Sequence, residues 1–309
     1  MKVIDLTPRG YCHGVLNALA MVKKVIKTDS YPRPIYILGQ IVHNEKITKA
    51  FAEYGVISLD QKGKTRLELI EKINEGTVIF TAHGISRQVI ERAKQKGLTY
   101  VNATCRDVMK VHKSVEIKLS EGYEVIYIGH KHHPEPEAIL ALNPKIYFVQ
   151  DEKDAFRLPA HLKDCKLFVT NQTTLSLYDI DLVLRIIETK FPHYVFDNEI
   201  CNATKIRQET VMQQETVDLM LVVGDNLSSN SNKLAFIGNH CQNIKSKLIS
   251  GVESIHLDWL KDIDSVSVTS GASTPTIVTE EVIQFLKQYN QNDPKTWDHH
   301  SKLDILDIL

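Results

Sequence analysis

Short apolar runs alternate with longer amphipathic stretches along most of the chain. The runs hold three to five residues, many of them β-branched or aromatic, and are apolar throughout, which is typical of parallel strands covered on both faces. Two intervening stretches, 15–26 and 108–119, carry apolar residues at helical spacing. This alternation predicts an α/β fold built from βαβ units. The expected strands are 3–6, 35–38, 77–80, 98–101, 125–128, 166–169, 194–196, 219–223 and 266–268.

The pattern repeats three times around three cysteines. Cys12, Cys105 and Cys201 are separated by 93 and 96 residues. Each follows an apolar run and precedes a helix-like stretch, and each interval carries two further strand signals. We therefore expect three similar α/β units with mostly parallel sheets, arranged as a pseudo-three-fold trefoil around a central cluster. The expected boundaries are 1–104, 105–200 and 201–288, with 289–309 as a C-terminal tail that wraps back.

The repeated cysteines are candidate metal ligands. A single buried cysteine usually behaves as a small hydrophobic residue, but chance does not place three at the same point of three units. A position before a helix lowers the thiol pKa and favours thiolate. No closely spaced pair of the kind zinc prefers is present, and isolated thiolates from three units fit an iron–sulfur cluster with one open position better. Cys165 and Cys241 lack repeat partners, so we assign them to packing or to the surface.

Polar loops follow the expected strands, where open parallel sheets bind their ligands. His43, His83 and His133 each come directly after a strand. One such histidine more often has a structural role, but three in a common cavity could donate to an anion such as a phosphate. Hydroxyls, an amide and helix N-termini would add donors for phosphate oxygens. These further candidates are Ser228, Ser229, Asn230 and Ser273.

One acidic side chain belongs to the same set of loops. Glu135 follows His133 and Pro134. A loop glutamate is usually solvated, but burial beside a metal cluster would raise its pKa and make it a proton source. Thr173 and Thr174 supply hydroxyls from another loop of the second unit. Glu135 is therefore the candidate general acid.

Composition limits the possible partners and location. The 309-residue chain has a formal charge of −1, which gives no general electrostatic basis for binding nucleic acid or an anionic membrane. No apolar run approaches the roughly 18 residues that span a bilayer, and the start lacks a signal-peptide pattern. Five scattered cysteines fit a reducing compartment better than a disulfide framework. We expect a cytoplasmic protein.

Nine motifs stand in order along the chain: PRGYCHGV at 8–15, VHN at 42–44, TAHG at 81–84, NATC at 102–105, HPE at 133–135, QTT at 172–174, ICNAT at 200–204, SSNSN at 228–232 and TSGAS at 269–273. Together they resemble the 4-hydroxy-3-methylbut-2-enyl diphosphate reductase family, from about residue 3 to residue 288. Three replacements depart from the family pattern: Arg106 stands where proline is usual, Ala138 where glycine is usual and Lys233 where arginine is usual. None replaces a candidate ligand or the acid, and Arg106 bears only on the cluster's local polarity and potential.

The resemblance implies a trefoil of three α/β domains around a [4Fe–4S] cluster held by the three repeated cysteines. It implies reductive removal of the allylic hydroxyl of (E)-4-hydroxy-3-methylbut-2-enyl diphosphate. The products would be isopentenyl and dimethylallyl diphosphate, in the last step of the non-mevalonate isoprenoid pathway. In this scheme Glu135 would donate protons and Thr173 would orient the hydroxyl end of the substrate. Binding the diphosphate or lining the pocket would fall to His43, His83, His133, Ser228, Ser229, Asn230 and Ser273.

Electrons would come from a separate protein, because no G-x-G-x-x-G fingerprint follows a strand. A ferredoxin or flavodoxin is the expected donor, and the enzyme would be a monomer or homodimer. Two alternatives stay open: a non-catalytic protein that uses a cluster structurally or as a sensor, and a zinc-dependent phosphate-ester hydrolase or transferase. Three cysteines rather than four, with an acid and phosphate donors in the same loops, favour the reductase.

Overall fold

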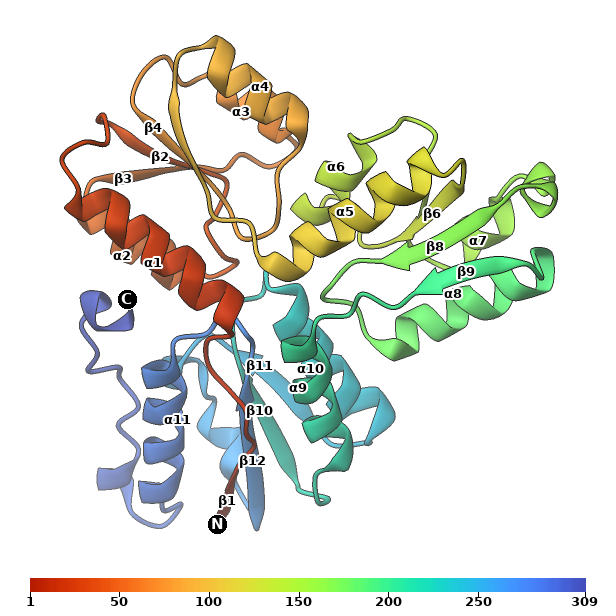
Figure 1. The fold of residues 1–309 in the computed structure, drawn as a ribbon. Helices are drawn as coiled ribbons and strands as arrows, with labels where there is room; N and C mark the ends of the chain where they lie inside the picture. The colour runs from red at the N-terminus through yellow and green to blue at the C-terminus, as the bar shows by residue number, and fades with distance from the viewer. The chain divides into compact units, whose positions relative to one another are not determined.

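The computed structural model describes residues 1–309 and contains three four-stranded parallel sheets. Their strand orders are β1-β12-β10-β11, β3-β2-β4-β5 and β7-β6-β8-β9. Figure 1 labels every strand except β5 and β7. The strands are β1 (Lys2–Asp5), β2 (Ile35–Leu38), β3 (Val56–Leu59), β4 (Thr77–Phe80), β5 (Thr99–Asn102), β6 (Glu124–Ile128), β7 (Tyr147–Val149), β8 (Leu167–Asn171), β9 (Tyr194–Asp197), β10 (Leu219–Val223), β11 (Ser246–Ile249) and β12 (Ser265–Ser270).

Helices connect the parallel strands, as crossover connections require. Short 3₁₀ segments add to them: η1 (Ala160–Asp164), η2 (Val252–Ser254), η3 (Leu257–Leu260), η4 (Pro294–Thr296) and η5 (Ile305–Ile308). The α-helices are α1 (His13–Lys27), α2 (Glu45–Glu53), α3 (Arg66–Ile70), α4 (Arg87–Gln95), α5 (Arg106–Ser120), α6 (Pro134–Leu140), α7 (Glu152–Arg157), α8 (Leu177–Lys190), α9 (Asn202–Gln213), α10 (Ser229–Cys241) and α11 (Thr276–Gln288).

The chain divides into two compact units, of which the first comprises Met1–Leu16, His43–Glu53 and Asn202–Leu309. It holds the β1-β12-β10-β11 sheet, in which Lys2 is paired with Ser265 and Asp5 with Val268. Strand alternation sends successive side chains of β10 to opposite faces. Leu219, Leu221 and Val223 join an apolar core with α11, whereas Met220 and Val222 join one with α10.

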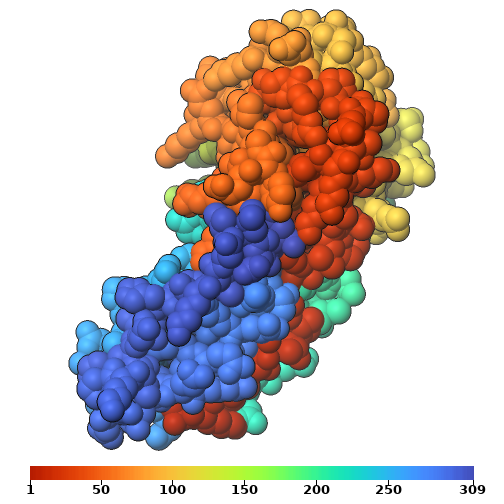
Figure 2. All heavy atoms as spheres, turned by 90° about the vertical axis from the view of Figure 1, so that its left-hand side faces the viewer, coloured from red at the N-terminus to blue at the C-terminus, as the bar shows by residue number.

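The C-terminal residues lie against the first unit. The Tyr11 hydroxyl donates to the Ile308 carbonyl oxygen at 2.6 Å, and Ile308 is buried in the core beside α11. The Ser301 hydroxyl donates to Glu281 of α11 at 2.8 Å. Figure 2 shows this segment, in dark blue, lying along the surface of residues that precede it in the chain. These contacts attach the C-terminal residues to α11 and to Tyr11 of the first unit.

The second unit comprises Asn17–Val42 and Tyr54–Cys201 and holds the other two sheets. In the sheet of β6 and β8, Ile126 and Val169 pack towards α7 and α8. Tyr127 and Phe168 pack on the opposite face, against Val111 of α5 and apolar residues of α6, and Figure 1 shows these helices on either side of that sheet. Burial on both faces explains why these strands are mostly apolar.

The predicted α/β class with parallel sheets is confirmed, and the structure contains three such sheets. Three strands went unpredicted: β3, β7 and β11, each an edge strand with partly exposed residues. Sheet membership also differs from the predicted division, because β1 pairs with β12 of the last unit rather than with the strands of 1–104. No helix has both the length and the apolar character needed to cross a bilayer.

Candidate functional site

All three repeated cysteines have the same backbone environment. Each cysteine lies in the segment that follows the carboxyl end of an edge strand. Its N–H group donates to a carbonyl in the loop that follows the neighbouring strand of the same sheet. This shared bond fixes each cysteine beside a second strand-end loop. The bonds run from Cys12 to Ala272 at 3.0 Å, from Cys105 to Ala82 at 2.9 Å and from Cys201 to Thr173 at 3.0 Å.

The cysteines also stand where helices begin, as predicted. Cys12 and Cys201 immediately precede α1 and α9, and Cys105 is the N-cap of α5. All three are half-buried and none forms a disulfide. Each sheet therefore places one cysteine at the start of a helix, at the end where parallel sheets bind their ligands.

The other two cysteines have local roles in the structure. The Cys165 thiol lies 3.6 Å from the His161 carbonyl oxygen, just before β8. Cys241 is the last residue of α10 and packs against an apolar cluster of the first unit. Neither occupies the strand-end position that the repeated cysteines share, which agrees with their assignment to packing.

In the first unit, candidate phosphate donors gather at the start of α10. Ser228 is the N-cap, and its hydroxyl accepts from the Ser231 N–H at 3.3 Å. The Ser273 hydroxyl lies 3.5 Å from the Ser228 hydroxyl and donates to the His43 carbonyl oxygen at 3.1 Å. Asn44 donates to the Ser273 carbonyl oxygen at 3.0 Å. The structure thus brings together Ser228, Ser273 and the backbone of His43.

Asn230 gives this group of residues the character of a binding site. It lies in the first turn of α10 and is 4% exposed, yet neither its side-chain oxygen nor its side-chain nitrogen has a hydrogen-bond partner. Leaving buried polar atoms unpaired costs about 1–3 kcal/mol each, so such groups in native proteins need an explanation. An anion at this helix N-terminus would supply the missing acceptor. Ser229, its neighbour, is half-buried.

In the second unit, Glu135 is almost completely buried at 1% exposure. His133 is the N-cap of α6 and Pro134 its first residue, which suits the fixed φ of proline. The carboxyl group is held from two sides. The Thr173 N–H donates to Glu135 Oε1 at 2.8 Å, and the Thr173 hydroxyl donates to Oε2 at 2.9 Å. The Tyr127 hydroxyl donates to Oε1 at 3.2 Å.

Burial raises the pKa of Glu135 to about 7 because desolvation disfavours the charged form. The hydrogen bonds from Thr173 and Tyr127 partly offset this effect, since they stabilise the carboxylate. A carboxyl group with a pKa near neutrality can hold a proton and release it. The structure therefore supports the predicted acid character of Glu135.

Two of the predicted histidines are neighbours in the same unit. The ring centroids of His83 and His133 lie 5.4 Å apart, edge to face. His133 Nδ1 accepts from the Glu135 N–H at 3.2 Å, so in the neutral ring the proton is on Nε2. Both rings lie in loops at the carboxyl ends of strands β4 and β6.

Tyr127 and Asn44 were not predicted as site residues. Tyr127 lay inside an apolar strand run, where an aromatic residue is expected to fill the core. Asn44 stood next to His43 in the VHN motif, and its proximity to Ser273 depends on contacts between distant parts of the chain. Only the three-dimensional structure brings these polar atoms to their partners.

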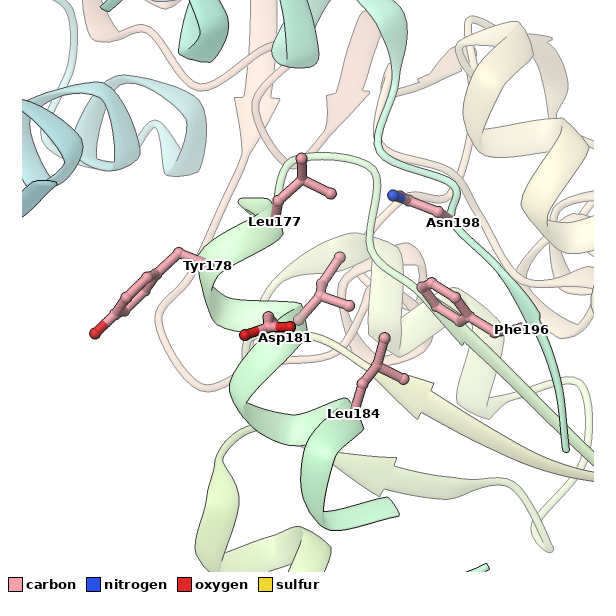
Figure 3. A pocket seen from close by; sticks show the side chains of 7 residues that line it. Leu177, Tyr178, Asp181, Leu184, Phe196 and Asn198 are labelled. Atoms are coloured by element: carbon pink, nitrogen blue, oxygen red, sulfur yellow. The ribbon is translucent and has the colours of Figure 1, made fainter. Parts of the chain in front are cut away.

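A shallow pocket of about 350 Å³ lies elsewhere in the second unit, between α8 and β9. Leucine and isoleucine side chains of α8, with Phe196 of β9, provide most of its lining (Figure 3). It contains none of the predicted ligands, the acid or the phosphate donors. The pocket therefore does not form part of the candidate site.

Comparisons with known proteins agree on one family. A family model described as LytB protein matches residues 3–287. The 4-hydroxy-3-methylbut-2-enyl diphosphate reductase of Geobacillus thermodenitrificans (strain NG80-2) is 49% identical, over 100% of this chain and 97% of that protein. The enzyme of the same name from Bacillus cereus (strain B4264) is 48% identical, over 100% of this chain and 97% of that protein.

The fold matches as well. The structure of E-1-hydroxy-2-methyl-but-2-enyl-4-diphosphate reductase from Plasmodium falciparum superimposes with a TM-score of 0.84 and 32% identity, covering 96% of this chain and 89% of the other. The family model and the relatives span nearly the whole chain, including every candidate site residue. This chain belongs to the LytB protein family, whose similar members are 4-hydroxy-3-methylbut-2-enyl diphosphate reductases.

Proposed function

We propose that this protein reductively removes the hydroxyl group of (E)-4-hydroxy-3-methylbut-2-enyl diphosphate, giving isopentenyl and dimethylallyl diphosphate. The reaction consumes two electrons and two protons and releases water. Membership of the family supports the reaction. The single observation in the structure that carries the proposal is the buried Glu135, held by Thr173 beside the backbone contact to Cys201.

Cys12, Cys105 and Cys201 would hold a [4Fe–4S] cluster. The donor set fits this group, because each sheet supplies one half-buried, unoxidised thiol at an equivalent backbone position. Three cysteine thiolates would hold the cluster and would leave one position on it open to the substrate. When bound, the cluster supplies the electrons and a Lewis-acidic iron; the chain's own residues supply binding, orientation and protons.

Glu135 would deliver the proton to the leaving hydroxyl through Thr173. The Thr173 hydroxyl is 2.9 Å from Glu135 Oε2 and can accept a proton from the acid while passing its own to a neighbouring oxygen. Its backbone is fixed by the bond from the Cys201 N–H. Thr173 therefore connects the acid to the cysteine loop, which is where the hydroxyl end of the substrate must lie.

The diphosphate would be bound by uncharged donors of the first unit, with His43, His83 and His133 lining the pocket. The unpaired side chain of Asn230, the Ser228 and Ser273 hydroxyls and the α10 N-terminus provide such donors. Ser229 adds a hydroxyl in the first turn of the helix. Local donors suit a chain whose formal charge is only −1, since long-range attraction contributes little.

The electron donor would be a ferredoxin or flavodoxin in a reducing cytoplasm. A non-catalytic cluster protein has no need for a buried acid with a pKa near 7 or for unpaired phosphate donors, and no observation favours that alternative. The proposed reaction is tested by anaerobic turnover of the hydroxymethylbutenyl diphosphate with a chemical reductant. Broad visible absorption and formation of both isoprenoid diphosphates are expected. A colourless zinc protein without turnover would overturn the proposal.

A further inference from the structure

Within the proposed reaction, and resting on it, we propose that Tyr127 is a positioning residue that occupies Glu135 Oε1 and so keeps the acid's proton on Oε2, facing Thr173. The hydroxyl donates to Oε1 at 3.2 Å, and Tyr127 does not itself need to touch the substrate. Its role is to decide which oxygen of the acid carries the transferable proton.

The strand fixes the tyrosine in place. Tyr127 lies in β6 and is 0% exposed. Its ring packs with Val125 and Phe168 in the core beneath α5 and α6, whereas Ile126 and Ile128 face the other core. A side chain confined in this way cannot turn its hydroxyl to another partner, because core side chains occupy single rotamers at close packing.

The hydrogen-bond pattern around Glu135 is asymmetric. Oε1 receives the Thr173 N–H, which can only donate, and also the Tyr127 hydroxyl. Oε2 faces only the Thr173 hydroxyl, which can either donate or accept. With both positions on Oε1 filled, the proton of the neutral acid is left to Oε2. That proton points at the hydroxyl of Thr173, the residue whose carbonyl oxygen accepts from the Cys201 N–H.

Tyr127 remains a donor over the working pH range. Burial, with a contribution from the nearby Glu135 charge, raises the pKa of Tyr127 well above its ordinary value. The phenol therefore stays neutral and keeps its proton. A neutral donor stabilises the carboxylate more than the protonated acid, since hydrogen bonds to charged groups are the stronger ones.

The threefold repeat shows that the hydroxyl is not needed to build the strand. Gly39, Gly129 and Gly224 form equivalent backbone bonds to the edge strand of their sheets. Two residues before these glycines stand Ile37, Tyr127 and Val222, all 0% exposed. Only the sheet of β6 and β8, which lies next to Glu135, has a hydroxyl at this position.

The same comparison applies to Thr173. Its carbonyl accepts the cysteine N–H that Ala82 and Ala272 accept in the other sheets. Thus two positions that are apolar in the other two sheets carry hydroxyls in the sheet of β6 and β8, at Tyr127 and Thr173. Both hydroxyls donate to Glu135. Two polar replacements that converge on one carboxyl group point to a role in its chemistry rather than in folding.

The test is the pH profile of anaerobic turnover by cluster-loaded Tyr127→Phe enzyme. Losing a donor to the carboxylate raises the pKa of Glu135. The alkaline limb of the turnover pH profile should therefore shift to higher pH by about 0.5–1 unit. The turnover number should fall by about three- to tenfold, with KM for the diphosphate substrate within about twofold. Tyr100→Phe removes a hydroxyl from a strand tyrosine stacked on Phe80 and should change none of these.

Two further variants separate the possible outcomes. In a Glu135→Gln background, Tyr127→Phe should have no additional effect, as expected when one residue acts through the other. If Tyr127→Phe loads poorly with iron, 3-fluorotyrosine placed at 127 alone keeps the ring and strengthens the donor, and the limb should then move to lower pH. An unshifted limb in either variant, while the wild type turns over normally, would overturn the role of Tyr127. Absent wild-type turnover would instead overturn the proposed function.

Discussion

Replacing Glu135 by glutamine should abolish most turnover while stabilising the folded protein at neutral and alkaline pH. Glutamine can present its oxygen to the Thr173 N–H and the Tyr127 hydroxyl and its NH₂ group to the Thr173 hydroxyl. This is the pattern of the protonated acid. The variant therefore keeps every hydrogen bond and loses only the transferable proton, which is worth about 10²-fold or more in rate.

The effect on stability follows from the pKa of Glu135. Burial raises it from 4.5 to about 7 in the folded protein, so folding favours the protonated form. The favourable contribution is complete below about pH 4.5, declines as the pH rises and is lost above about pH 7. The difference between these two pKa values corresponds to roughly 3 kcal/mol in the free energy of unfolding. At pH 8 the glutamine variant should therefore be more stable than the wild type by up to that amount. Near pH 4.5 the two proteins should differ little.

Two anaerobic measurements on cluster-loaded protein test this reasoning. Infrared difference titration of wild type against the Glu135→Gln variant should show the band of a buried protonated carboxyl disappearing with a midpoint near pH 7. Denaturant unfolding at several pH values should give the pH-dependent stability difference. A carboxyl that titrates near its ordinary pKa of about 4.3, or near-wild-type turnover of the variant, would refute the assignment of Glu135 as the acid.

Three further sets of substitutions test the remaining parts of the site. Serine at any repeated cysteine should abolish iron binding and activity, while serine at Cys165 or Cys241 should preserve both; equal iron loss in either control would contradict the threefold assignment. Alanine at Asn230 or Ser273 should weaken binding of inorganic diphosphate by roughly tenfold or more, whereas alanine at the exposed Ser250 should not. Unchanged diphosphate affinity in the Asn230 and Ser273 variants would count against this pocket. Thr173→Val should retain iron but lose about tenfold or more in turnover, with Thr173→Ser restoring activity; a fully active valine variant would exclude the hydroxyl from proton transfer.

The sequence predicted the central strands of each sheet because burial on both faces leaves an uninterrupted apolar run. Half of the edge strands, β1, β5 and β9, were also predicted, since each precedes a repeated cysteine. The other edge strands, β3, β7 and β11, have no such marker and are short or partly polar; Ser246–Ile249, for example, has a lysine and a serine among four residues. The pairing of β1 with β12 joins the two ends of the chain. Local periodicity carries no information about such distant pairing.

For the candidate site, the sequence likewise predicted which residues to consider but not the contacts between them. Strand-end position, helix starts and motif identity were enough to select Cys105, Glu135 and Thr173. The sequence could not show that the Glu135 carboxyl is held by three hydrogen bonds or that Asn230 is buried without a partner, since both facts depend on tertiary contacts. Tyr127 was missed for the opposite reason: an aromatic residue within an apolar strand has an adequate explanation in packing alone.

The repeat suggests how one backbone arrangement can support asymmetric chemistry. All three sheets place a cysteine beside the loop of a neighbouring strand through the same N–H to carbonyl bond. The specific chemistry enters through side chains that leave this bond untouched: Thr173 where the other units have alanine, and Tyr127 where they have isoleucine or valine. In the proposed mechanism these replacements separate the three cysteine ligands, one from each sheet, from the one proton donor. The acid and its supporting hydroxyls can therefore lie beside a single sheet although every sheet would contribute a cysteine to the cluster.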